Sequence, residues 1–328
     1  MTRAIVARAP SRLDFGGGWT DVPPYCDREG GSVCNIAITR YATATAALDE
    51  HIAQRVAGAP PSSDSLTAAA LRRAAIPGAV AHVTSDFPAG AGLGGSSACG
   101  VALAGALAML RDTALPPDEL AALSRATEIE DLGVIGGYQD HYAAAFGGAL
   151  LLGFGDCVSV EVLTMPGTSA ADLVRRGILV YTGESRLSAS TIAAVRDSYL
   201  DGASRTVGAL ARMKALAGDM ASAIRAGDVD ALGRLVGEHW VHQRALHASI
   251  TTARIDAIVE TAERAGALGV KALGASGGGC VLAIAAEGRE DELARALAPL
   301  GERLEYAIDW DGFQVVAVLD EQHDDGAS

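Results

Sequence analysis

Lysine is scarce in this sequence, which holds only Lys214 and Lys271 among 328 residues. Acidic residues outnumber lysine and arginine by 40 to 26, and the formal net charge is −14. Such a chain has little positive field with which to attract nucleic acid or an anionic membrane surface. We therefore expect neither partner, and an anionic ligand would have to be held by local groups.

Cysteine is also sparse, and long apolar runs are missing. The five cysteines are far apart and never spaced as CxxC, which argues against a disulfide framework and a zinc site. No uncharged apolar run reaches eighteen residues, and the first residues are too charged for a secretory signal. These absences predict a cytoplasmic protein.

Hydrophobic residues make up 49% of the chain and charged residues 20%, so the chain can bury a large core and is not disordered. Short extended segments alternate with helical ones. The expected strands include residues 4–8, 32–38, 41–48, 80–85, 304–308 and 313–318, and the expected helices include 191–217 and 229–247. The pattern predicts an α+β protein of two lobes, residues 1–165 and residues 166–328.

A glycine-rich segment, PAGAGLGGSSA from Pro88 to Ala98, lies between a predicted strand and a predicted helix. Glycines let backbone N–H groups approach a ligand closely, and the following helix directs its positive end to the same place, so the segment is typical of a phosphate cradle. Its two serines can cap the helix or reach Mg²⁺. The segment also fits GxGxxG, but it follows a β-rich stretch and a helix occupies the next positions, which disfavours a dinucleotide fold.

Two further glycine-rich segments contain polar candidates. Residues 9–25 hold Arg12, Asp14, Trp19 and Asp21, which suggest a polar sugar site with an aromatic wall or simply a long solvated turn. Residues 274–280 place four glycines within six residues, a costly choice for a plain hairpin. Close approach to a ligand or to another loop would account for it.

Asp140 is the acidic candidate, and it lies at the start of an apolar helical run. Taken alone it could be a helix cap, or a base that accepts a proton from a hydroxyl. Glu128 and Glu130, upstream on a predicted helix, are alternative partners for Mg²⁺.

Together, the three glycine-rich segments and Asp140 resemble the GHMP kinase superfamily in order and spacing over nearly the whole chain. The branch most similar is that of anomeric sugar kinases, which includes heptose 7-phosphate kinases and L-fucokinases. Residues 17–31 are close to the fucokinase pattern, whereas residues 139–148 and the chain length are closer to the heptose kinases. Ser276, Gly95 and His141 depart from residues common in the branch.

The resemblance implies an N-terminal lobe like ribosomal protein S5 domain 2, a ferredoxin-like C-terminal lobe, and ATP, Mg²⁺ and a sugar in the cleft between them. Asp140 would accept the proton of the anomeric hydroxyl, Arg12 would orient Asp140, and Ser97 or Ser96 would hold Mg²⁺ with Glu128. ATP would lie on Pro88, Gly90, Gly92, Leu93, Gly94, Gly95, Ser96 and Ser97. The sugar would contact Asp21, Trp19, Gly18, Gly183, Arg186 and Gly278.

The resemblance therefore implies an ATP-dependent kinase for the C1 hydroxyl of D-glycero-D-manno-heptose 7-phosphate or a related heptose or hexose, with an L-fucokinase-like hexose 1-kinase as the alternative. A sugar- and ATP-binding sensor without catalysis is the competing class, disfavoured because Arg12, Ser97, Glu128 and Asp140 are all present. A nicotinamide oxidoreductase would have to bind NAD(P)H. A homodimer is compatible with the sequence but not indicated by it.

Overall fold

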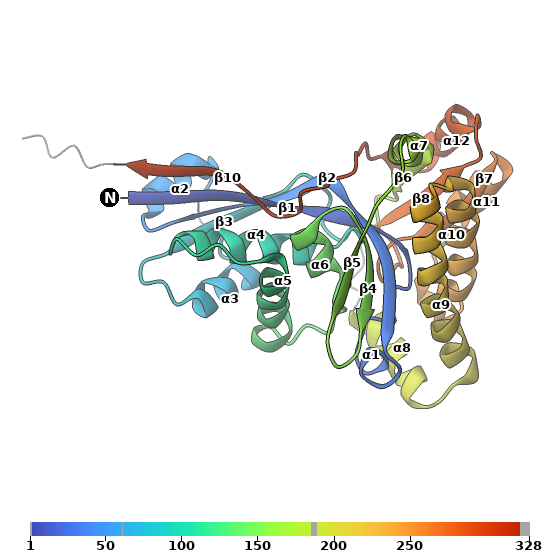
Figure 1. Ribbon diagram of the computed structural model, residues 1–328, viewed down its shortest axis with the longest axis horizontal. Coiled ribbons are helices and arrows are strands. Elements are labelled where there is room, and N and C mark those ends of the chain that lie inside the picture. Colours follow the sequence, from blue (N-terminus) through green and yellow to red (C-terminus); the bar gives the residue numbers. More distant parts are fainter. Residues whose placement is uncertain (1, 61, 185–188, 322–328) are drawn as a thin grey trace, which may run out of the picture.

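The computed structural model describes residues 2–60, 62–184 and 189–321. Two antiparallel sheets form the framework of two lobes (Figure 1), which confirms the expected α+β architecture. The first sheet has the order β10-β1-β2-β4-β5, with β3 also paired to β2, and the second has the order β7-β8-β6-β9. No described helix is long and apolar enough to cross a membrane.

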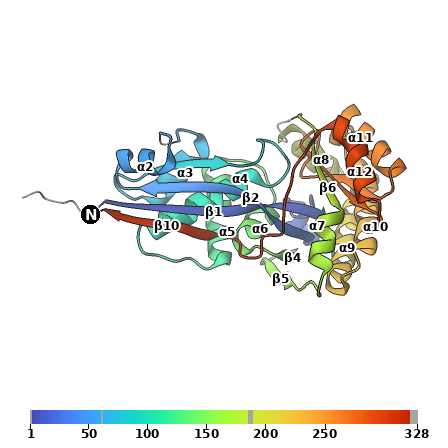
Figure 2. The ribbon, with the colours of Figure 1, turned by 90° about the horizontal axis from the view of Figure 1, so that it is seen from above.

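The bounds of the strands show which parts of the chain form each sheet. The first sheet contains β1 (Thr2–Gly16), β2 (Gly31–Ala47), β3 (Val80–Ser85), β4 (Ala149–Phe154), β5 (Ser159–Leu163) and β10 (Gln314–Glu321). The second contains β6 (Gly177–Tyr181), β7 (Ala267–Ala272), β8 (Cys280–Ala285) and β9 (Glu302–Arg303). Strand β10 crosses back from the far end of the chain to lie beside β1 (Figure 2).

Helices pack against both sheets. In the first lobe they are α1 (Tyr25–Glu29), α2 (Glu50–Ala57), α3 (Ser65–Ala74), α4 (Gly95–Met109), α5 (Pro117–Ala126), the π-helix η1 (Thr127–Asp131) and α6 (Gln139–Phe146). The rest are α7 (Ser169–Arg176), α8 (Ala189–Leu200), α9 (Ser204–Ala226), α10 (Val229–Arg244), the 3₁₀ turn η2 (Ala248–Ile250), α11 (Ala253–Arg264), α12 (Glu290–Leu297) and the 3₁₀ turn η3 (Ala298–Leu300).

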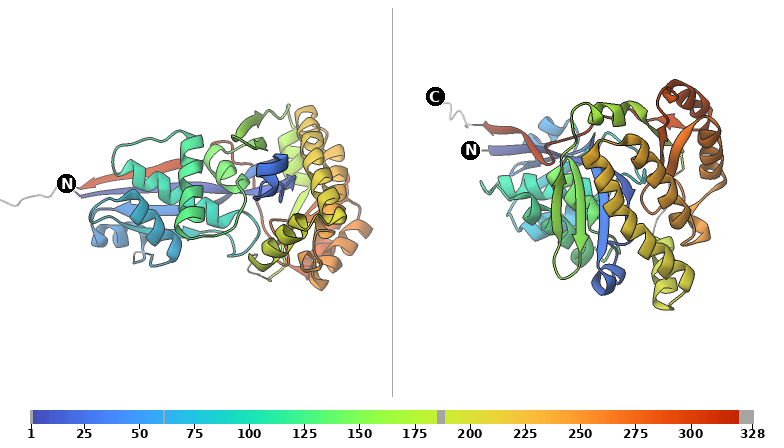
Figure 3. Two further views of the ribbon diagram at one scale, coloured as in Figure 1. Left: turned by 90° about the horizontal axis from the view of Figure 1, so that it is seen from below. Right: turned by 45° about the vertical axis from the view of Figure 1, so that its right-hand side comes forward.

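Helix α4 is the central helix of the first lobe. It is apolar around most of its circumference, and its small Ala and Gly residues let it pack closely on β1 and β2. Helices α3, α5 and α6 surround it. Helix α9 passes from the second lobe onto β1, β2 and the β4–β5 hairpin (Figure 3). The two lobes therefore share a packed apolar boundary.

The expected strands and helices differ from the structure at four places. Strand β1 continues to Gly16, so Arg12 lies on a strand rather than in a turn. Residues 32–38 and 41–48 belong to one strand, β2, whose pairing with β1 shifts at Pro10/Ser11. The predicted helix 191–217 is two helices, because Gly202 adopts a left-handed φ of 69° between them. The predicted strand 304–308 contributes only the isolated bridge of Ile308 to Ile38.

Helix α10 crosses β7 at a contact between glycines. A Cβ atom at Gly269 would overlap the Gly233 carbonyl oxygen and lie 2.6 Å from the Gly237 nitrogen. We expect Gly269→Ala to lower the free energy of unfolding by about 1–3 kcal/mol, because helix and strand would have to separate. Urea unfolding measures this change.

The matched control is Gly208→Ala, in an exposed part of α9 where a Cβ would meet nothing within 4 Å. It should raise the stability by up to about 1 kcal/mol through helix propensity. Equal stability of the Gly269→Ala variant and the wild type would contradict the close packing of α10 on β7.

Candidate active site

A cavity of about 560 Å³ lies where the end of β1, the 88–97 loop, η1 and the start of α6 meet, a volume in the range of small-molecule sites. Gly274 and Ala275 from the second lobe and Ile192 of α8 complete its wall. It is lined by these residues predicted from the sequence: Arg12, Gly18, Trp19, Asp21, Pro88, Gly90, Gly92, Leu93, Gly94, Gly95, Ser96, Ser97, Glu128 and Asp140. The serine-bearing loop and Asp140 thus meet in one crevice.

Arg12 joins three elements of the crevice. Its Nε and Nη2 atoms each lie 2.7 Å from Oδ1 of Asp140, and Nη1 donates to the Gly92 carbonyl oxygen at 2.6 Å. The Arg12 backbone N–H also donates to the Leu93 carbonyl oxygen at 3.0 Å. Arg12 is 3% exposed, so its charge is held in place by these partners and can act on a ligand beside Asp140.

The 88–97 loop approaches Asp140 because it lacks side chains. Gly94 has a left-handed φ of 76°, and a Cβ on it would lie 3.0 Å from Cγ of Asp140. Helix α4 begins directly after it, with Ser96 and Ser97 in the first turn. The N–H groups of that turn and the positive end of the helix therefore face the space beside Asp140, as a phosphate group requires.

Glu128 is held at the loop by a hydrogen-bond network. Oε1 accepts from the Ser96 hydroxyl at 2.6 Å, and Oε2 lies 3.0 Å from Nε2 of His141. The His141 ring also contacts Ser97 Oγ at 3.3 Å and Ser124 Oγ, through Nδ1, at 3.0 Å. Burial raises the pKa of Glu128, but the hydrogen bonds from His141 and the serines outweigh this effect and hold the pKa below its usual value.

Glu130 has a different environment. It is two-thirds exposed and pairs with Arg73 of α3 at 2.8 Å. Glu128 lines the cavity, whereas Glu130 is not among the described lining residues. The π-helix η1 carries both, and such a turn is frequent at functional sites.

Asp21 lies under the crevice with its side chain engaged by α6. Its Oδ2 accepts from the backbone N–H groups of Tyr138 at 2.9 Å and Gln139 at 3.0 Å. Burial is the main cause that raises its pKa to about 6, although the Gln139 N–H lowers it. Asp21 therefore fixes the start of the helix that carries Asp140, besides lining the cavity.

Trp19 supplies an aromatic part of the cavity wall, as the sequence predicts. Its φ of 76° is a conformation that residues with side chains rarely adopt. Local backbone strain of this kind is typical of binding sites.

Two of the residues predicted to bind the sugar do not line this cavity, and a third is not described. Gly183 and Gly278 are not among the described residues that line the cavity. A Cβ on Gly278 would lie 2.7 Å from the Glu184 carbonyl oxygen, so this glycine serves the packing of two loops. Arg186 lies outside the described residues.

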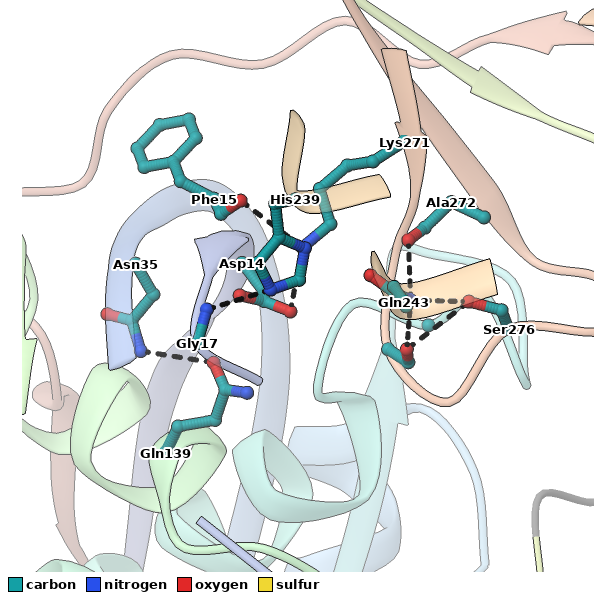
Figure 4. A network of polar contacts seen from close by, with 12 residues as sticks. Asp14, Phe15, Gly17, Asn35, Gln139, His239, Gln243, Lys271, Ala272 and Ser276 are labelled. Carbon is teal, nitrogen blue, oxygen red and sulfur yellow. Dashed lines mark hydrogen bonds and ion pairs between the residues drawn. The ribbon is translucent and has the colours of Figure 1, made fainter. Parts of the chain in front are cut away.

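The glycine-rich loop of residues 274–280 instead supports the 88–97 loop. The Cys280 N–H donates to the Ala91 carbonyl oxygen at 2.7 Å, and a Cβ on Gly92 would lie 2.6 Å from the Leu273 carbonyl oxygen. Gln243 Nε2 holds this loop through the Ala272 and Gly274 carbonyl oxygens, both at 3.2 Å (Figure 4). The phosphate-type loop thus rests on the second lobe.

Sequence reasoning missed two polar residues near the crevice, Ser124 and Lys271, and it noted Asp14 only as one of the two acids in residues 9–25. Lys271 could have been noticed, because a lysine is unusual in an apolar strand and this chain has only two. Asp14 follows Arg12 by two residues and so shares a strand face with it. Ser124 gives no signal, since only the fold brings it to His141.

Comparison with known proteins defines the class of this chain. The family models for the GHMP kinases N terminal domain and the GHMP kinases C terminal match residues 64–148 and 220–302. The chain belongs to the GHMP kinase family, and it is accordingly a phosphotransferase. The resemblance seen in the sequence is confirmed.

Individual relatives share little more than a quarter of their residues with this chain. The chain is 28% identical to the D-glycero-alpha-D-manno-heptose 7-phosphate kinase of Campylobacter jejuni, over 90% of this chain and 93% of that protein. It is also 28% identical to the L-fucokinase/L-fucose-1-P guanylyltransferase of Bacteroides fragilis, over 95% of this chain but 38% of that protein. A crystal structure described as a D-glycero-D-manno-heptose 1-phosphate kinase from Bacteroides thetaiotaomicron matches 98% of this chain and 100% of its own, at 26% identity and a TM-score of 0.74.

Burial of Asp21 generates a pH dependence of stability. Its pKa of about 6 in the folded protein lies above the ordinary 3.8, so the native state binds a proton more tightly than the unfolded chain. Stability contributed by this group is therefore fully present below pH 3.8 and is lost as the pH rises from there to about 6, by up to about 3 kcal/mol in total. Asp21→Asn keeps an acceptor for the α6 N–H groups and should lack this loss.

Urea unfolding of both proteins at pH 4.5 and at pH 8 checks the prediction. The difference in unfolding free energy between wild type and Asp21→Asn should shift in favour of the variant at pH 8. A difference independent of pH would mean that burial does not raise the pKa of Asp21.

Proposed function

We propose that this protein transfers the terminal phosphoryl group of ATP to the anomeric hydroxyl of a sugar. The observation that carries the proposal is Arg12, which joins Asp140 to the glycine-rich loop at one cavity. Phosphoryl transfer depends mainly on positioning and on neutralising charge, and this arrangement supplies both. The similarity to heptose and fucose kinases over nearly the whole chain supports a sugar as acceptor.

The residues of the crevice divide the work. The loop from Pro88 to Ser97 would bind the ATP phosphates with its N–H groups. Asp140 would accept the proton from the anomeric hydroxyl as its oxygen attacks the terminal phosphorus and ADP leaves. Arg12 would orient Asp140 and stabilise charge on the transferred group. The sugar would lie against Asp21, Trp19 and Gly18, while Gly183, Arg186 and Gly278 remain predictions for its outer contacts.

Oxygen ligands suited to Mg²⁺ surround the same space. Ser97, or Ser96, and Glu128 would hold the ion together with phosphate oxygens. The described residues contain no cluster of three or more His, Cys, Asp or Glu that could hold a metal ion. When bound, Mg²⁺ neutralises negative charge on the phosphates.

D-glycero-D-manno-heptose 7-phosphate is the first candidate acceptor, because the match to the heptose 7-phosphate kinase relative covers 90% of this chain and 93% of that protein. An L-fucose-like hexose is the second, because residues 17–26 resemble the fucokinase pattern and the relative covers 95% of this chain. Both relatives are 28% identical to this chain, so the choice between the two acceptors is made by experiment.

The deciding experiment measures ADP release with ATP, Mg²⁺ and each of heptose 7-phosphate, L-fucose and D-mannose. We expect ADP to be released with one of these sugars, and phosphorus NMR to place the new ester on the anomeric carbon. Sugar-induced thermal stabilisation without ADP release from any of the three would instead favour a sensor, and an ester at another carbon would refute anomeric transfer.

Asp140→Asn is the control for that assay. It should lower kcat by about 100-fold or more and leave ATP binding unchanged, because only the proton acceptor is removed. Turnover near the wild-type rate would exclude Asp140 as the base.

Glu128 and Glu130 form a matched pair for the Mg²⁺ site. We expect Glu128→Gln to raise the Mg²⁺ concentration that gives half-maximal rate by roughly tenfold or more, because a ligand charge is lost. Glu130→Gln should leave it unchanged, since that side chain pairs with Arg73. Titration of the initial rate with Mg²⁺ distinguishes them, and equal effects would refute the assignment.

A further inference from the structure

A buried ion pair of Lys271 and Asp14 links the two lobes (Figure 4), and its Asp14 lines the cavity. Lys271 of β7 is fully buried, and its Nζ lies 3.1 Å from Oδ2 of Asp14 on β1 and 3.3 Å from the Phe15 carbonyl oxygen. Beside this pair the Gly17 N–H donates to Nε2 of His239 at 2.9 Å. The end of β1 is therefore fixed from the second lobe.

Such a pair needs an explanation beyond stability. Removing two charges from water costs several kcal/mol, which their attraction often does not exceed, so apolar residues at both positions would serve the fold as well. Asp14 is also incompletely satisfied, because its buried Oδ1 has no hydrogen-bond partner among the residues that the structure describes. A buried polar atom without a partner calls for an explanation, and a ligand group is one of them.

The position of Asp14 indicates what the free oxygen is for. Asp14 lines the cavity together with Gly18, Gln139 and Asp140. A Cβ at residue 18 would overlap Asp14 Oδ2 and lie 3.0 Å from Nε2 of Gln139. Only a glycine there leaves Asp14 and Gln139 together at the cavity wall, next to the carboxylate expected to receive the acceptor's proton.

The charges at this end of the cavity define the chemistry that fits. Three carboxylates, those of Asp14, Asp21 and Asp140, meet here, and the charges of Asp14 and Asp140 both raise the pKa of Asp21. The cations facing them are Arg12, which is engaged by Asp140, and Lys271, which is engaged by Asp14. Hydroxyl groups that donate hydrogen bonds suit this wall, whereas a phosphate group would be repelled.

We propose that Asp14 is an acceptor-binding residue, whose carboxylate accepts a hydrogen bond from a sugar hydroxyl, and that Lys271 is a positioning residue that holds this carboxylate from the second lobe. The inference rests on the proposed sugar kinase function and deepens it. The hydroxyl-bearing edge of the acceptor faces the Asp14 wall, and any phosphate that the acceptor carries lies elsewhere.

The test compares Asp14→Asn, Lys271→Met and the double variant Asp14→Asn/Lys271→Met, using whichever of the three sugars gives ADP release with the wild type. Each single variant leaves one buried group without its partner and can lose stability for that reason alone. The double variant removes both charges, so it should be more stable in urea than Lys271→Met.

In the double variant we expect the KM for the sugar to rise about 5- to 10-fold, because an amide oxygen at residue 14 accepts a weaker hydrogen bond than a carboxylate does. The KM for ATP should stay within about twofold, because the phosphate loop is untouched. A merely structural pair predicts the opposite result, a sugar KM restored to the wild-type value once both charges are gone.

Arg176→Met is the control for loss of a buried cation. Arg176 is buried in α7, pairs with Asp172 at 3.2 Å and with Asp230, and does not line the cavity among the described residues. It should lower stability without changing the sugar KM.

Two failures are distinguishable. If the wild type releases no ADP with any of the three sugars, the proposed function fails and the role of Asp14 falls with it. If the wild type is active and the double variant keeps the wild-type sugar KM, only the role of Asp14 is refuted.

Discussion

The buried guanidinium of Arg12 is the interaction on which the architecture of the crevice depends. It sits on β1 and joins Asp140, at the start of α6, to the backbone of the glycine-rich loop before α4. Those three elements come from distant parts of the chain. The positive charge of Arg12 holds the Asp140 carboxylate next to the glycine-rich loop. One buried side chain thus sets the distance between the carboxylate that we propose as the base and the loop that we propose to bind phosphate.

A steric constraint complements this electrostatic one. The loop that begins α4 and the loop that follows β7 touch backbone to backbone at Gly92, Leu273 and Gly274. Side chains at these glycines would push the lobes apart and open the crevice. The high glycine content of the chain therefore serves the assembly of the site as much as the binding of a ligand, and the second lobe contributes more support than contact.

Local composition made the phosphate-type loop predictable, because glycine and serine before a helix have a direct physical meaning at Gly94–Ser97. Arg12 and Asp140 are 128 residues apart, so nothing local could pair them, and the family resemblance supplied what spacing could not. The extent of β1 was underestimated because Pro10 and three consecutive glycines resemble a turn, whereas pairing with β2 and β10 keeps the segment extended. Asp21 was expected at the sugar, and its bond to the α6 N–H groups could not be seen before α6 was in place. Lys271 was visible as an oddity, but its partner on another sheet was not.

The return of β10 to the first sheet has a consequence for biosynthesis. Strand β1 needs β10 on its outer side, yet the ribosome makes these strands some three hundred residues apart, as the pairing of Arg3 with Asp320 illustrates. During translation β1 must wait with one row of amide and carbonyl groups unpaired until residues 314–321 emerge. Completion of the first sheet is thereby tied to the synthesis of β10, which favours folding of the two lobes together over independent maturation of each.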